Sequence, residues 1–142
     1  MKKRIIPLFL GICAALLLSS CGTPEGNPLP EGMDETAVLD TGREIVTDLN
    51  AGNWQEVYDL MREDAKTATG SPDAVAEHMQ AVLDKAGPYV SEESAMATGQ
   101  KLDSGEGYAT AVFYCKHKKD EVLYRIAFST DMELLGLQVS KK

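Results

Sequence analysis

Apolar residues recur every three or four positions over much of the first half of the chain, which is the period of an amphipathic helix. The longest such stripe consists of Val38, Leu39, Gly42, Ile45, Val46 and Leu49. Asn53 with Glu56 three residues later forms a capping-box pattern, and Ser71 followed by Pro72 is a typical helix start. The pattern therefore predicts three helices: one over about 34–50, a short one that Asn53 begins, and one over about 71–86.

After Pro88 the apolar period changes to two, which is the period of a strand. Four strands are expected, the first of them weak and polar, over about 89–102, 108–116, 122–129 and 134–139. The turns between them are short, so the strands should pair as an antiparallel meander. Helices followed by such a meander predict an α+β domain in which the N-terminal helices pack on one face of a four-stranded antiparallel sheet.

The strand over 108–116 is apolar on both of its faces. One face carries Tyr108, Val112 and Tyr114, and the other carries Ala109, Ala111, Phe113 and Cys115. One face should meet the helices, and the other needs a cover because the outer face of an antiparallel sheet normally alternates to polar residues. A second copy packing sheet to sheet would provide it, which predicts a homodimer. Strong twist and long neighbouring side chains within one monomer are the alternative.

The predicted core takes one or two large side chains from each amphipathic element. Each of them lies on the apolar stripe of its own helix or strand, so we expect these residues to be buried together: Trp54, Ile45, Leu83, Ile126 and Phe128.

The N-terminus has the regions of an export signal. Basic residues at positions 2–4 precede an apolar stretch over 5–18, which is too short to span a membrane as a helix. The run Leu18-Ser19-Ser20-Cys21 resembles the bacterial lipobox, where a signal peptidase cuts just before the cysteine. We expect residues 1–20 to be removed and Cys21 to carry a diacylglycerol, with a further acyl chain needed for stable anchoring. An ordinary secretory signal with a chance cysteine is the alternative.

Residues 21–33 are expected to form the lipidated cysteine and a tether, because proline and glycine alternate there and apolar content is low. The domain then occupies 34–142, on the outer face of the cytoplasmic membrane or on an outer membrane where the cell has one. The chain has a formal net charge of −8, and loss of the basic residues at 2–4 makes it more acidic still. Such a surface excludes general nucleic-acid binding and repels anionic lipid, so the membrane contact rests on the diacylglycerol of Cys21.

Three stretches connect the chain with a known family: LNAGNW at 49–54, AGPY at 86–89 and FSTDMELLGL at 128–137. With them, residues 35–140 resemble the NTF2-like superfamily and, more narrowly, the DUF3887 group of bacterial lipoproteins and secreted proteins. The resemblance implies a cone of helices on a curved sheet, whose mouth can hold a small apolar ligand. The function of the DUF3887 group is itself unknown, so the resemblance implies no substrate.

The sequence contains no catalytic signature, and we predict no catalytic residue, no metal and no cofactor. Cys115 and His117 supply only two of the three or four ligands that a zinc site needs, and His78 lies off the apolar stripe of its helix. In the mature chain Cys115 would be the remaining free thiol, interpreted as a small apolar strand residue. The residues with the best prospect of contacting a ligand are Tyr124, Tyr58 and Trp54.

Two functions of different classes follow from these patterns. The first is a membrane-anchored, non-catalytic module that binds a small apolar ligand or an envelope protein. The second is a small NTF2-like enzyme, an isomerase, lyase or hydrolase, acting on an apolar metabolite. A buried carboxylate beside Tyr124 in a closed pocket would favour the enzyme, whereas a shallow or filled cone would favour partner binding.

Overall fold

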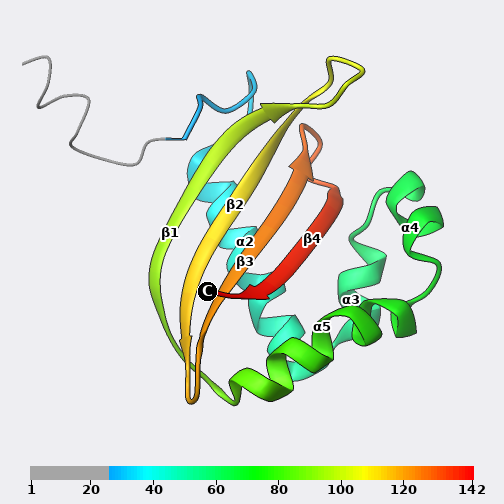
Figure 1. The fold of residues 1–142 in the computed structure, drawn as a ribbon. Coiled ribbons are helices and arrows are strands. Elements are labelled where there is room, and N and C mark those ends of the chain that lie inside the picture. Colours follow the sequence, from blue (N-terminus) through cyan, green and yellow to red (C-terminus); the bar gives the residue numbers. More distant parts are fainter. Residues whose placement is uncertain (1–25) are drawn as a thin grey trace, which may run out of the picture.

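The computed structural model describes residues 26–142, so the predicted signal peptide and Cys21 lie outside the described part. Helices come first and strands follow, as predicted (Figure 1). The elements are α2 (Glu35–Ala51), α3 (Trp54–Asp59), α4 (Glu63–Thr69), α5 (Pro72–Ala86), β1 (Tyr89–Lys101), β2 (Gly107–His117), β3 (Glu121–Ser129) and β4 (Leu134–Lys141). Within residues 26–142, no helix is both long and apolar enough to cross a bilayer.

The four strands form an open antiparallel sheet in the order β1-β2-β3-β4, which confirms the predicted meander and the α+β class. The sheet curves, and α2 lies across one of its faces (Figure 1). There α2 contacts β1, β2 and β3, whereas α4 and α5 contact β4. The face of β2 that meets the helices is the one carrying Ala109, Ala111, Phe113 and Cys115, all of which are buried.

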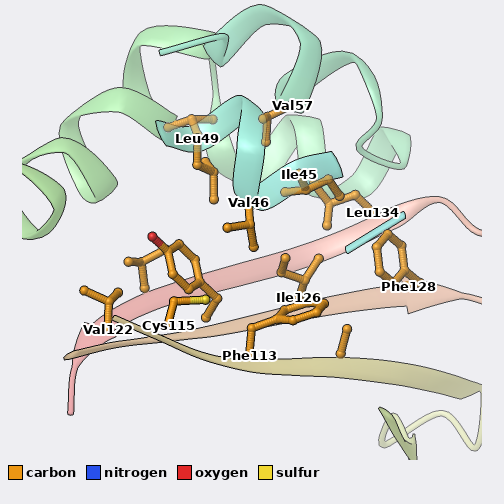
Figure 2. Close-up of a cluster of buried hydrophobic side chains, with 14 of the residues drawn as sticks. Ile45, Val46, Leu49, Val57, Phe113, Cys115, Val122, Ile126, Phe128 and Leu134 are labelled. Atoms are coloured by element: carbon orange, nitrogen blue, oxygen red, sulfur yellow. The ribbon is translucent and has the colours of Figure 1, made fainter. Parts of the chain in front are cut away.

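The hydrophobic core fills the space between α2 and the sheet (Figure 2). Gly42 allows the close approach, because a Cβ at this position would come within 2.7 Å of the Phe113 ring. Of the predicted core residues, four are buried as expected: Ile45, Leu83, Ile126 and Phe128. The prediction for Trp54 was wrong, since this side chain is only half-buried and packs against the margin of the core.

Local details of the helical half differ from the sequence pattern. The side chain of Asn53 makes no capping bond to α3 and instead donates from Nδ2 to Asp48 Oδ1 at 3.0 Å. Helix α4 was not predicted, because it contributes no buried residue and therefore has no apolar stripe to detect. The predicted start of the last helix is confirmed, with the Ser71 side chain accepting from the amide of Ala74.

The segment just before α2 belongs to the folded domain, so the predicted tether is wrong for residues 27–33. Asn27 accepts a hydrogen bond from the amide of Gly99 at 2.9 Å, and its own amide donates to Thr98 Oγ1 at 2.9 Å. Gly99 has no side chain to keep the segment away, and Leu29 and Met33 pack against the core. This segment uses backbone hydrogen bonds and a close approach at glycine, neither of which leaves an apolar periodicity in the sequence.

Candidate ligand-binding site

A cavity of about 340 Å³ opens between α2 and the sheet. Ligand sites of proteins typically begin at about 300 Å³ and combine apolar walls with a few polar groups. Its lining consists of Arg43, Val46, Thr47 and Asn50 from α2, Tyr89 and Glu92 from β1, and Phe113 and Cys115 from β2.

Helix and strand periodicity explains why these residues meet. Residues three, four and seven positions apart share one face of a helix, so 43, 46, 47 and 50 line one side of α2. Alternate residues of a strand point to the same face, which brings Phe113 and Cys115 together on β2. The register between β1 and β2 places Glu92 opposite Cys115. The walls of the cavity therefore follow from one helix face and one sheet face.

An ion pair between α2 and β1 forms part of the rim. Arg43 donates from Nε to Glu92 Oε1 at 2.9 Å and from Nη2 to Oε2 at 3.2 Å, while its Nη1 donates to Asp40 Oδ1 at 3.0 Å. The hydrogen bond to Glu92 is the main cause of the raised pKa of Arg43. About 45% of the Arg43 side chain is exposed, so the pair contributes little to stability, about 0–1 kcal/mol. Breaking this ion pair would therefore cost little free energy.

Beneath the cavity a chain of hydrogen bonds runs from Asn50 through Tyr124 and His117 to Gly87. Asn50 Nδ2 lies 2.8 Å from Val46 O and 3.0 Å from the Tyr124 hydroxyl. The Tyr124 hydroxyl lies 2.8 Å from His117 Nε2, and His117 Nδ1 lies 2.8 Å from Gly87 O. Tyr124 and His117 are both almost fully buried.

Carbonyl oxygens only accept, and this determines the proton positions along the chain. Val46 O needs a donor, so the side-chain atom of Asn50 next to it must be the nitrogen Nδ2. The same Nδ2 then donates its second proton to the Tyr124 hydroxyl. Gly87 O requires a proton on His117 Nδ1, so a neutral His117 accepts at Nε2 from Tyr124. Every member is satisfied in this one arrangement, and the carbonyl Oδ1 of Asn50 is the polar atom that the chain leaves unused.

The nucleophilic groups of the cavity are held in their neutral forms. Burial raises the pKa of the Cys115 thiol to about 11, and burial also raises the pKa of Tyr89. The thiolate is the reactive form of cysteine. Cys115 therefore acts as an apolar wall at physiological pH, as its interpretation as a strand residue implied.

The structure places the three predicted ligand-contacting residues in different surroundings. Tyr124 lies under the cavity and reaches it only through Asn50. Trp54 lines a neighbouring groove of about 530 Å³ that shares Asn50 and Tyr89 with the cavity. Tyr58 lies elsewhere, with its hydroxyl 3.4 Å from Gly70 O. The three residues therefore do not form one site.

Sequence reasoning missed the polar residues of the cavity. Arg43 and Asn50 flank the apolar stripe of α2, where solvated residues are the usual finding, and Glu92 lies on a polar strand. His78 is exposed, with its Nδ1 2.7 Å from Ala74 O. In the part of the chain that the structure describes, no three His, Cys, Asp or Glu side chains converge in a way that could hold a metal ion.

Comparisons with known proteins bear on the fold and the family. A protein from Ruminococcus gnavus ATCC 29149, solved by NMR, shares this fold with a TM-score of 0.66 and 20% sequence identity, and the match covers 79% of this chain and 96% of that chain. The match spans nearly the whole of that chain, so the solved protein consists of little besides this fold. No curated protein matches the chain. The profile of the family described as "Protein of unknown function (DUF3887)" matches residues 42–137, so the chain belongs to the DUF3887 family.

Proposed function

We propose that this protein is a lipid-anchored, extracytoplasmic binding module with an NTF2-like domain, and that it holds a small ligand in the cavity between α2 and the sheet. The observation that carries the proposal is the cavity itself. Its volume of about 340 Å³, its apolar walls at Val46 and Phe113, and its few polar groups at the rim are the features of a small-molecule site.

The arrangement around Tyr124 supports binding rather than catalysis. An enzyme of the alternative class would need an acid or base facing the ligand. The Tyr124 hydroxyl is engaged by Asn50 and His117, and neither Tyr124 nor His117 lines the cavity. The carboxylate that does line it, Glu92, is bound to Arg43 at the surface. The buried network therefore serves to hold α2 on the sheet.

A blocked cavity with an intact fold tests the binding site. Thr47 lines the cavity mouth from an exposed position, so Thr47→Phe should fill the mouth without disturbing the core. Thr67→Phe is a matched control, because both hydroxyls donate to the carbonyl four residues earlier in their helices and Thr67 lies outside the cavity. Native mass spectrometry of protein purified from the producing cell should find a small molecule on wild type and Thr67→Phe, and none on Thr47→Phe. Equal occupancy in all three would refute this site.

The anchor rests on the lipobox run that ends in Cys21. Replacing Cys21 with Ala should abolish incorporation of labelled palmitate, and should release the protein from the membrane or leave it there unprocessed. A variant that still takes up label and fractionates normally would contradict the anchor, whatever the outcome for the cavity.

A further inference from the structure

We propose that the ligand of the α2 cavity is a small organic cation, an apolar or aromatic body that carries one ammonium group. This inference rests on the proposed function and specifies the chemical class that the cavity takes. It follows from the polarity of the hydrogen-bond chain beneath the cavity, from the charges at its rim and from the aromatic rings in its walls.

The hydrogen-bond chain leaves the cavity with acceptors. Both N–H groups of Asn50 are used, one by Val46 O and one by the Tyr124 hydroxyl, so its Oδ1 remains to accept from a ligand. The hydroxyl proton of Thr47 is donated to Arg43 O at 3.0 Å, which leaves the lone pairs of Thr47 Oγ1. An ammonium group has three donors and no acceptor, which matches these atoms.

The charges near the rim also favour a cation. The guanidinium of Arg43 is shared between two carboxylates, those of Glu92 and Asp40. Two carboxylates therefore share one guanidinium, and this part of the rim has a net negative charge. An anionic ligand would have to displace Glu92 from Arg43 and then remain beside it.

Aromatic rings line the interior where the apolar body would lie. Phe113 forms the floor from β2, and Tyr89 forms the side from the start of β1. A cation over an aromatic face gains about 0.5–2 kcal/mol, more when it is shielded from water. The walls therefore suit the body of the ligand and also its charge.

Three probes of nearly equal size separate charge from shape: 2-phenylethylammonium, 2-phenylethanol and 3-phenylpropionate. Each is titrated at low salt into the protein expressed without its first 21 residues, and the backbone amide shifts of Phe113 and Cys115 are followed by NMR. We expect the ammonium probe to bind about three- to tenfold more tightly than the alcohol, and the carboxylate probe to bind most weakly. The preference should shrink as salt is added.

Charge variants provide the second measurement. Glu92→Gln keeps the shape of the rim. It should lower the affinity for the ammonium probe about threefold or more and leave the affinity for the alcohol unchanged. Arg43→Gln removes the competing cation and should raise the affinity for the ammonium probe. Glu77→Gln, an exposed carboxylate on α5 that does not line the cavity, is the control and should change neither.

The outcomes distinguish this inference from the function on which it rests. If the alcohol or the carboxylate shifts Phe113 and Cys115 at lower concentration than the ammonium probe, the cavity binds ligands but the cation assignment is wrong. If the ammonium preference survives Glu92→Gln unchanged, the rim charge is not its cause and the assignment fails. If no probe shifts either residue, the cavity is not a site for ligands of this size, and both proposals fail.

Discussion

Tyr124→Phe isolates the contribution of the buried hydrogen-bond chain to stability. The substitution removes one oxygen and keeps the ring, which lies in the core between α2 and the sheet. Two bonds are lost: the one accepted from Asn50 at 3.0 Å and the one made with His117 Nε2 at 2.8 Å. The change therefore tests whether this chain holds the helix on the sheet.

The expected cost follows from the burial of the two partners. Asn50 lies at the surface, where water can replace the lost acceptor at little cost. His117 is 1% exposed, so its Nε2 becomes a buried acceptor without a donor. Leaving such a group unsatisfied costs about 1–3 kcal/mol. We expect the free energy of unfolding to fall by about 2 kcal/mol, a large part of the stability of a typical domain.

Urea denaturation of the domain provides the measurement. The midpoint should move to lower urea while the slope m stays unchanged, because the surface exposed on unfolding is the same. Tyr108→Phe is the control: this tyrosine lies on the other face of the sheet, and within residues 26–142 its hydroxyl has no hydrogen-bond partner. It should change stability by less than about 0.5 kcal/mol. A Tyr124→Phe effect as small as that of the control would refute the reasoning.

Three further predictions concern the core, the thiol and the outer face of the sheet. Phe128→Ala should cost about 3–5 kcal/mol in the same assay, since the ring is 1% exposed, and a loss under about 1 kcal/mol would contradict its place in the core. Between pH 9 and 11 the unfolded chain loses the proton of Cys115 while the folded chain keeps it, so the free energy of unfolding should fall as pH rises, by up to about 3 kcal/mol from this group. Cys115→Ala should show a smaller slope, which the tyrosines Tyr89 and Tyr124 still cause because burial raises their pKa values as well. An equal slope in wild type and variant would refute the assignment. The half-buried residues Tyr108, Val112 and Tyr114 predict a sheet-to-sheet homodimer, which sedimentation should detect at micromolar concentration; a monomer that persists to about 100 μM would exclude it.

Periodicity alone determined most of the architecture. The stripe on α2 and the alternation on β3 predicted which face of each element is buried, and Ile45, Ile126 and Phe128 lie there. The change of period after Pro88 predicted the order of helices and strands and hence the α+β class. These patterns are local consequences of burying one face, so the sequence records them directly.

Periodicity failed where burial does not govern the local structure. Helix α4 buries no residue. Residues 27–33 are held by backbone hydrogen bonds, and they can lie this close to β1 because Gly99 has no side chain. Trp54 follows the pattern of a core residue but lies at the first position of a short helix, at the edge of a surface groove.

The candidate site was decided by the tertiary structure. Arg43, Asn50 and Glu92 look like solvated residues in the sequence, and they converge because α2 crosses the sheet above β1 and β2. Tyr124 was identified from its strand face, but its partners Asn50 and His117 lie 74 and 7 positions away in the chain. Polar contacts between distant segments leave no periodic signal, because they depend on the crossing angle and register of elements that only the folded chain brings together.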